Sequence, residues 1–393
     1  MLQIATEKDI LAGKVTDVYF ERTRQVLQAE KLDAHVVAEF VVKKFPRGRS
    51  WGVFAGLEEA TTLLENLPIK VWSVPEGTIF RPHEPIFIIE GNYLDFGRYE
   101  TALLGFFCQA SGIATQAARC RIAAGDRPVI SFGARRMHPS IAPMIERNAY
   151  IGGCNGVATI KSAELLGLKP SGTVPHALIL IMGDTVKAMK AFDRHIDPDV
   201  IRVALVDTFN DEKFEALRVA EELQEKLFAV RLDTPGSRRG DLVEIMREIR
   251  WELDLRGYNH IKIFLSGGLD EHTILRYNRF ADAYGVGTSL SNAPVLDYSM
   301  DLVEINGTPI AKRGKTSGRK DVRRCPSCFR SEIVPWGAPE RSCDVCHETM
   351  PSLLRLIWDG KSWQQPLPSA DDIRQYVLDQ LSHVELDDLD LSK

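Results

Sequence analysis

Two rhythms of apolar and polar positions succeed one another along this chain, and the change falls near residue 128. Beyond it, short apolar runs alternate with longer segments of helical spacing. Buried parallel strands are near-continuous apolar runs, and strands separated by helices of this length predict βαβ units. The apolar runs are 128–133, 176–183, 202–207, 229–233, 261–268 and 283–290, and the helical segments are 142–152, 156–167, 185–196, 211–227, 239–257 and 270–281. Roughly six or seven such units favour a closed or nearly closed α/β barrel, with an open doubly wound sheet as the alternative.

The first 113 residues follow a mixed pattern. Residues 33–46 alternate as a half-buried strand does, and 75–91 predicts strand, turn and strand. Residues 57–66 and 104–125 have helical spacing. We therefore expect an α/β domain before the barrel.

Strand-like residues return at 295–312, and the basic segment 312–324 that follows contains Gly and Ser, which predicts an exposed loop or linker. The sequence thus suggests three parts. They are an α/β N-terminal domain, 1–113, completed by about 295–320; an α/β barrel, 114–294; and a small cysteine-bearing domain, 321–393, whose acidic tail 383–393 we expect to be frayed.

Composition narrows the class of protein. The chain has 393 residues, 44% of them hydrophobic, which is enough for more than one buried core. A net charge of −5 argues against a dedicated nucleic-acid binder. The charged N-terminus does not resemble a signal peptide, and the longest apolar run is too short to span a bilayer. With seven cysteines and no secretory signal, we expect a reducing, cytoplasmic setting.

Four of the seven cysteines form a metal-binding pattern. Cys325, Cys328, Cys343 and Cys346 are spaced C-x₂-C-x₁₄-C-x₂-C, close to a zinc ribbon. Four protein ligands leave no open position, so we expect a structural zinc site. Two redox-active cysteine pairs, or a knuckle that binds RNA, are the alternatives. His347 is a spare candidate ligand.

Chemistry-bearing residues collect where the predicted barrel strands end, which is where α/β barrels place their active sites. Cations beside a phosphate-binding loop suit a phosphorylated, anionic substrate, and carboxylates suit Mg²⁺ or a developing positive charge. Each residue also has an ordinary structural reading: Asp207 and Asp233, for example, each precede a helical segment and could be helix N-caps. The strand-end residues are Phe132, Arg135, Arg136, His138, Gly172, Thr173, His176, Asp207, Arg231, Asp233 and Gly236.

Small residues mark the last two strand ends. They are Ser266, Gly267 and Gly268, then Gly285, Gly287 and Thr288. Barrels often bind a phosphate monoester at these two loops, because backbone N–H groups can approach it closely where the residues are small. We expect a phosphate-binding cup here.

Seven motifs together resemble the nicotinate phosphoribosyltransferase family over nearly the whole chain. They are TDVYFERT, SFGARR, SGTVPHA, VDTFND, RLDTPGSRRGD, SGGLDE and YGVGTSL. The C-terminal cysteines and the modest length look like the archaeal type of this family. The resemblance implies a type II phosphoribosyltransferase architecture, with an irregular α/β barrel and a head-to-tail homodimer that shares its active sites.

The same resemblance implies a reaction and roles for residues. Nicotinate condenses with 5-phosphoribosyl-1-pyrophosphate to give nicotinate mononucleotide and pyrophosphate, in NAD biosynthesis, with Mg²⁺ and coupled ATP hydrolysis. By family position Phe132 stacks on the pyridine ring beside Arg135, and Tyr19 covers its other face from the partner subunit. His176 falls at the phosphorylated histidine, and Asp207 and Asp233 fall at acidic positions around the ribose, the metal and the ring. The 5′-phosphate loops contain Gly267, Gly268, Gly287 and Thr288.

Other functions remain open on the sequence alone. Quinolinate and nicotinamide phosphoribosyltransferases share the architecture. A sugar-phosphate lyase or isomerase would use the same phosphate cup, but Lys161 and Lys262 lack the strand-end setting of a Schiff-base lysine. A zinc-ribbon RNA-binding protein is a third class, which the acidic net charge disfavours.

Overall fold

The computed structural model describes residues 2–238 and 240–386. The chain divides into two compact units, one made of Met1–Thr115 with Pro294–Lys393 and the other of Gln116–Ala293. In this division the cysteine-bearing segment belongs to the first unit. The acidic tail that the sequence analysis expects to be frayed lies outside the described residues from 387 onward.

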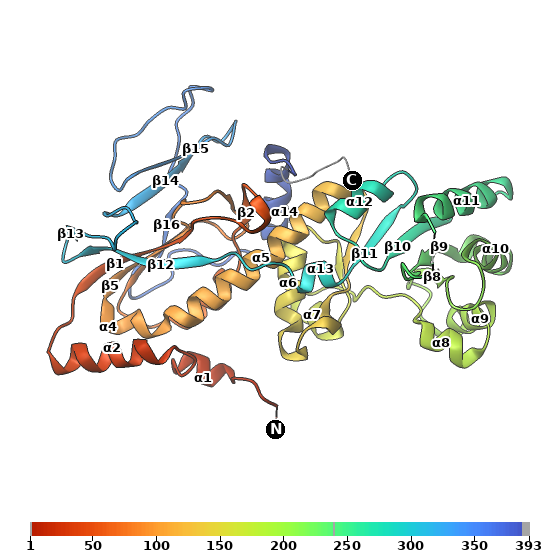
Figure 1. Ribbon diagram of the computed structural model, residues 1–393, viewed down its shortest axis with the longest axis horizontal. Helices are drawn as coiled ribbons and strands as arrows, with labels where there is room; N and C mark the ends of the chain where they lie inside the picture. Colours follow the sequence, from red (N-terminus) through yellow and green to blue (C-terminus); the bar gives the residue numbers. More distant parts are fainter. Residues whose placement is uncertain (1, 239, 387–393) are drawn as a thin grey trace. The chain divides into compact units, whose positions relative to one another are not determined.

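The first unit is built on a six-stranded sheet in the order β13-β12-β1-β5-β3-β16 (Figure 1). Its neighbouring strands are antiparallel. Two short ladders, β2 with β4 and β14 with β15, complete the unit. The strands are β1 His35–Val42, β2 Gly52–Val53, β3 Lys70–Ser73, β4 Ile79–Phe80, β5 Phe87–Asn92, β12 Tyr298–Ile305, β13 Thr308–Pro309, β14 Lys320–Arg324, β15 Ser331–Pro335 and β16 Arg355–Trp358.

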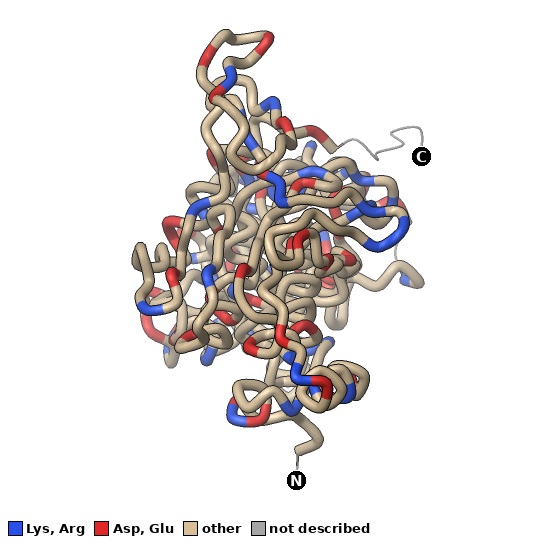
Figure 2. The backbone as a smooth tube through the Cα atoms, turned by 90° about the vertical axis from the view of Figure 1, so that its left-hand side faces the viewer, with Lys and Arg blue, Asp and Glu red and all other residues tan. Residues whose placement is uncertain are grey.

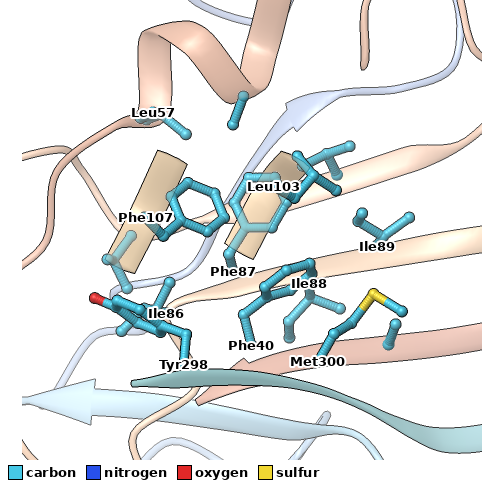
Figure 3. Close-up of a cluster of buried hydrophobic side chains, with 14 of the residues drawn as sticks. Phe40, Leu57, Ile86, Phe87, Ile88, Ile89, Leu103, Phe107, Tyr298 and Met300 are labelled. Carbon is cyan, nitrogen blue, oxygen red and sulfur yellow. The ribbon is translucent and has the colours of Figure 1, made fainter. Parts of the chain in front are cut away.

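Aromatic side chains form the core between this sheet and helix α5 (Figure 3). Phe107 of α5 lies 5.6 Å from Phe40 and 5.0 Å from Phe87, measured between ring centroids. Such tilted and edge-on pairs stabilise a core beyond the area they bury. The helices of this unit are α1 Glu7–Leu11, α2 Val18–Ala29, α3 Leu57–Leu64, α4 Tyr93–Phe96 and α14 Ala370–Gln380, while α5, Glu100–Ala124, contains the boundary between the units.

The basic segment 312–324 is a loop over residues 312–318, as its composition predicts, but its last residues differ from that prediction. Its last five residues form β14, and Arg319, Arg323 and Arg324 are buried. Glu39 of β1 explains part of the difference, because its carboxylate accepts hydrogen bonds from the Lys320 backbone N–H (2.6 Å) and Nζ (2.8 Å). The same contact covers the polar face of β1, so a strand that the sequence predicts to be half-buried is buried on both faces.

The second unit holds a six-stranded parallel sheet in the order β7-β6-β11-β10-β9-β8. Its two outer strands, β7 and β8, do not pair with each other, so the sheet is a curled half-barrel rather than a closed barrel. The parallel βαβ organisation predicted from the apolar runs is confirmed. The strands are β6 Val129–Ser131, β7 Gly156–Val157, β8 Arg202–Leu205, β9 Leu227–Leu232, β10 Lys262–Ser266 and β11 Ala283–Val286.

The strand predicted for one apolar run of this unit is wrong. His176–Met182 is the short helix α8 rather than a strand. Length and composition explain the error, because a short run of six apolar residues after His176 fits a strand or a helix equally well. The helices of the second unit are α6 Ala142–Ile151, α7 Ile160–Leu166, α8 His176–Met182, α9 Thr185–His195, α10 Glu212–Leu223, α11 Leu242–Leu255, α12 Glu271–Tyr277 and α13 Thr288–Ser291.

Charges of both signs are interspersed along the backbone (Figure 2). Within residues 2–238 and 240–386, no helix is both long and apolar enough to cross a membrane.

Candidate active site

A cavity of about 310 Å³ opens at the carboxyl ends of the half-barrel strands. Parallel strands bring their carboxyl ends to one edge of a sheet, so residues far apart in sequence meet there. Thirteen of the strand-end residues named from the sequence line this cavity: Phe132, Arg135, Arg136, Gly172, Thr173, Arg231, Asp233, Ser266, Gly267, Gly268, Gly285, Gly287 and Thr288.

Arg231, near the end of β9, organises one wall of the cavity. Its Nη1 donates to Thr173 Oγ1 (2.6 Å) and its Nε to Ser266 Oγ (2.8 Å). Ser266 Oγ in turn donates to Asp233 Oδ1 (2.7 Å), and Arg231 Nη2 lies 3.5 Å from Asp233 Oδ2. Burial lowers the pKa of Arg231, while the charge of Asp233 opposes the shift. The guanidinium therefore stays fixed and charged beside the hollow.

The aromatic side of the cavity depends on a glycine. The Arg231 guanidinium lies 5.3 Å from the centroid of the Phe132 ring, and Phe264 meets that ring edge-on at 5.9 Å. A Cβ at Gly285 would lie 2.5 Å from the ring of Phe132, so any other residue at this position would displace it. Arg135, in the 3₁₀ turn Ala134–Arg136, adds a second cation.

The two glycine-rich loops also line the cavity. Gly267 and Gly268 have φ values of +90° and +70°, which L-residues with a side chain rarely adopt. A Cβ at Gly267 would also lie 3.2 Å from Asp233 Oδ1. Ser289 Oγ donates to the Leu269 carbonyl (2.7 Å) and so joins the loop after β10 to the loop after β11. Because the residues of these loops have small side chains or none, their backbone atoms form the cavity wall.

The aspartates at the ends of β8 and β9 are not helix caps. Asp211 caps α10 and Asp241 caps α11. Asp207 and Asp233 precede these caps and turn toward other polar side chains instead. The capping alternative for the two predicted site carboxylates is therefore wrong.

Asp207 pairs with His176. His176 Nε2 lies 3.2 Å from Asp207 Oδ1, and the side chains are 41% and 2% exposed respectively. Burial raises the pKa of Asp207; the His176 charge lowers it, and the nearby Asp233 charge raises it further. Asp207 and His176 are not among the residues that line the 310 Å³ cavity.

The sequence analysis missed one wall of the cavity, formed by Ala158, Thr159 and Ser171. Glu146 of α6, fully buried, accepts hydrogen bonds from the backbone N–H groups of Ala158 (2.8 Å) and Thr159 (3.0 Å). Thr159 also caps α7 by accepting from Ser162 N. A threonine three residues before a serine at a helix start was the available signal, but it predicts a cap and not a cavity.

Tyr19 belongs to the first unit, on α2, where it is 56% exposed. Its ring lies 4.3 Å from that of Phe20. The exposed ring is available to contact another molecule. That it reaches the active site of a partner subunit stays a prediction.

The four cysteines of the first unit converge as their spacing predicts. Their Sγ atoms all lie within 4.8 Å of one another, and the Cys328 and Cys343 sulfurs are 3.6 Å apart. A tetrahedral zinc with Zn–S bonds of about 2.3 Å requires S···S separations of about 3.8 Å. Backbone N–H groups of Cys346 and Val345 lower the pKa of the Cys343 thiol to about 7, whereas hydrogen bonding with Cys328 raises the pKa of Cys346 to about 12. The cluster fits a metal such as zinc.

Comparison with known proteins identifies the family. The model of the quinolinate phosphoribosyl transferase N-terminal domain matches residues 17–111, and that of the C-terminal domain matches 113–301. The chain is 30% identical to nicotinate phosphoribosyltransferase pncB1 of Mycobacterium tuberculosis, across 84% of this chain and 82% of that protein. The chain belongs to the nicotinate phosphoribosyltransferase family.

Solved structures agree with this family assignment. The enzyme superimposes on nicotinate-nucleotide pyrophosphorylase from Pyrococcus furiosus with a TM-score of 0.96 and 51% identity, over 98% of this chain and 99% of that one. Human nicotinic acid phosphoribosyltransferase gives a TM-score of 0.78 over 96% of this chain and 95% of that one, and at 20% identity it supports the fold alone. The type II phosphoribosyltransferase fold expected from the motifs is confirmed.

Proposed function

We propose that this phosphoribosyltransferase condenses nicotinate with 5-phosphoribosyl-1-pyrophosphate, giving nicotinate mononucleotide and pyrophosphate for NAD synthesis. The observation that carries the proposal is the composition of one cavity. An aromatic ring and two arginines, Phe132 with Arg135 and Arg231, face the same 310 Å³ hollow as the glycine loops after β10 and β11. A flat anionic base suits the first group, and a 5′-phosphate suits the second.

In this reaction the base binds between aromatic and cationic groups. Phe132 stacks on the pyridine ring, and Arg135 is the cation for its carboxylate. Thr173 and Ser266 hold the Arg231 guanidinium in place, so it loses little rotational freedom when substrate binds. The loops with Gly267, Gly268, Gly287 and Thr288 bind the 5′-phosphate through backbone groups.

Carboxylates stabilise the transition state. Loss of pyrophosphate leaves positive charge at C1′ of the ribose, and Asp207 and Asp233 provide fixed negative charge near it. The negative charge of Asp233 raises the pKa of Asp207, because it repels a second negative charge, and a bound cation would relieve this repulsion. Mg²⁺ takes carboxylate and phosphate oxygens as ligands, and when bound by these aspartates and the substrate it would neutralise charge on the leaving pyrophosphate.

Quinolinate is the second candidate base, favoured by the names of the two matching family models. Purified enzyme should be incubated with phosphoribosyl pyrophosphate and each of nicotinate, quinolinate and nicotinamide. Nicotinate alone should yield nicotinate mononucleotide, without release of CO₂. If the enzyme instead forms nucleotide from quinolinate and releases stoichiometric CO₂, quinolinate is the substrate and the proposal is wrong.

We further propose that ATP phosphorylates His176 and couples hydrolysis to product formation. His176 is 41% exposed, so its ring is open to solvent, and the buried Asp207 carboxylate orients it. The variant His176→Asn should lose ATP hydrolysis and the ATP-dependent gain in yield, with slower basal transfer retained. ATP labelled on the γ-phosphate should leave an acid-labile label on the wild type only. Wild-type ATP hydrolysis in the variant would assign His176 a structural role.

Tyr19 is proposed to reach the base from a second copy of the chain in a homodimer. Its exposed ring on α2 supports this. Mixing inactive Tyr19→Ala and Asp207→Ala homodimers should restore part of the activity once subunits exchange. Verified heterodimers without activity would contradict a shared site. We also propose zinc as the metal of the cysteine cluster. We propose the cytoplasm as the setting, because none of the seven cysteines, all within the described residues, forms a disulfide.

A further inference from the structure

Helix α8, which begins with His176, is weakly anchored by its own packing. Of its seven residues only Ile179 is buried, while Leu180 and Ile181 are 57% and 84% exposed. A helix this short is marginal without tertiary contacts. Something else must fix the position of His176 beside Asp207.

Polar contacts fix the far end of α8. The helix ends at Gly183, with φ of +76°, and the next residue, Asp184, caps α9 by accepting from Lys187 N (2.8 Å). Asp184 Oδ2 also accepts from Arg218 Nη2 (2.6 Å). The corner between α8 and α9 is therefore held to α10 by a charged contact.

Arg218 connects this corner to the loop that contains Asp207. Its Nη1 donates to both carboxylate oxygens of Glu215, at 2.9 and 3.0 Å. Glu215 is fully buried and also accepts from the Asn210 side-chain amide, three residues after Asp207. A buried carboxylate without partners is costly, so this arrangement strongly favours one position of Asn210 and Arg218.

The segment 176–184 is thus tied to the segment 207–218 at both ends. His176 meets Asp207 at one end, and Asp184 meets Arg218 at the other. We propose that Glu215 and Arg218 are positioning residues that hold α8, and with it His176, within reach of Asp207. The expected effect on catalysis rests on the proposed function, in which His176 is phosphorylated. The expected effect on the position of α8 does not.

The test compares Arg218→Ala with a matched control in the full-length enzyme. Lys190 and Glu222 form an exposed ion pair between the same two helices, α9 and α10. Glu222→Gln therefore removes a charge contact between these helices without touching Glu215 or Asp184. Backbone hydrogen exchange over residues 176–183 should rise about tenfold in Arg218→Ala and stay at the wild-type rate in Glu222→Gln.

Kinetics provide the second readout. Arg218→Ala should lower the ATP-dependent kcat about tenfold with KM for phosphoribosyl pyrophosphate within about twofold, because misplacing a catalytic group affects turnover more than binding. Arg218→Lys, which keeps the charge but not the fork, should restore part of kcat. Asp184→Asn keeps a good N-cap and spares the buried Glu215, so it tests the link even where Arg218→Ala folds poorly, and it should shift both readouts in the same direction.

Wild-type exchange over 176–183 in both Arg218→Ala and Asp184→Asn would overturn the proposal, as would equal effects in Glu222→Gln. Hydrogen exchange needs no substrate. If the wild type makes no nicotinate mononucleotide, the proposed function fails, and the exchange result still decides whether Arg218 and Glu215 hold α8.

Discussion

The cysteine cluster of the first unit and the strand-end cavity of the second differ in what their polar atoms face. In the cluster, Cys325 and Cys343 are almost fully buried and the four sulfurs face one common point. In the cavity, Arg231 binds three side chains and still borders an open hollow of about 310 Å³. A closed site, in which four sulfurs face one metal position, can only stabilise the fold. An open site, in which polar side chains border a cavity, leaves room for a substrate.

Breaking the closed site should have the largest effect on stability. Cys343→Ser removes one thiolate from the metal site, and we expect the free energy of unfolding to fall by roughly 4–5 kcal/mol, since a structural metal contributes directly to folding. Metal content, measured by mass spectrometry, should fall with it. Turnover per folded molecule should stay within about twofold of wild type. A variant of full stability that has lost turnover would contradict the closed-site interpretation.

Removing a polar side chain from the open site should lower catalytic activity far more than stability. Arg231→Ala removes the guanidinium from the cavity wall, and we expect kcat/KM to fall roughly 10²–10³-fold, as for other preorganised electrostatic groups. The melting temperature should change by only a few degrees. Arg231→Lys is the control for charge alone, because a lysine cannot contact Thr173 and Ser266 together as the guanidinium does. Full activity in Arg231→Ala would place the substrate elsewhere.

A buried arginine away from the cavity sharpens the comparison. Arg319 of the first unit lies between the rings of Trp72 and Trp336, 3.8 and 3.4 Å from their centroids, and its Nη1 contacts Glu90 at 2.9 Å. Arg319→Ala opens a gap between two indoles and removes the hydrogen bond from Arg319 to Glu90, so we expect a loss of about 2–3 kcal/mol with unchanged kcat. Arg341→Ala, which breaks the exposed pair with Glu332, should cost less than about 0.5 kcal/mol. Similar losses in the two variants would mean that the tryptophan contacts contribute little.

Sequence reasoning succeeded where short-range pattern sets the structure. The parallel strands of the second unit are near-continuous apolar runs, and their ends bring Arg231, Asp233 and Ser266 to one edge whatever the details of packing. The cysteine spacing likewise fixes two knuckles. Both constellations depend on local sequence plus one topological rule, which is why they were predictable.

The failures share a different cause. His176–Met182 forms a helix because Pro175 and Gly183 bound it and because Asp184 begins the next helix, a choice that hydrophobicity alone does not specify. Residues 320–324 form a strand rather than part of a loop because a distant carboxylate, Glu39, accepts hydrogen bonds from Lys320. Ala158 and Thr159 are held at the cavity by Glu146, which is twelve and thirteen residues away in the chain, respectively. Contacts of this kind are long-range, and no local pattern encodes them.

Among the four main variants, leaving the controls aside, the smallest effect concerns a single carboxyl group in the first unit. Burial raises the pKa of Glu100 to about 7; the charge of Lys312 opposes the shift, and Asp301 and Asp17 add to it. A folded-state pKa above the unfolded value of 4.5 means that the folded chain binds more protons between pH 4.5 and 7. Stability from this group is therefore present below pH 4.5 and is lost as the pH rises to about 7. Glu100→Gln should stabilise the protein by about 1 kcal/mol at pH 8, allowing for solvent screening, and should have no effect at pH 4. Urea unfolding at the two pH values measures this, with Glu340→Gln, an exposed position, as the control. An equal gain at both pH values would show that Glu100 acts through packing and not through its charge.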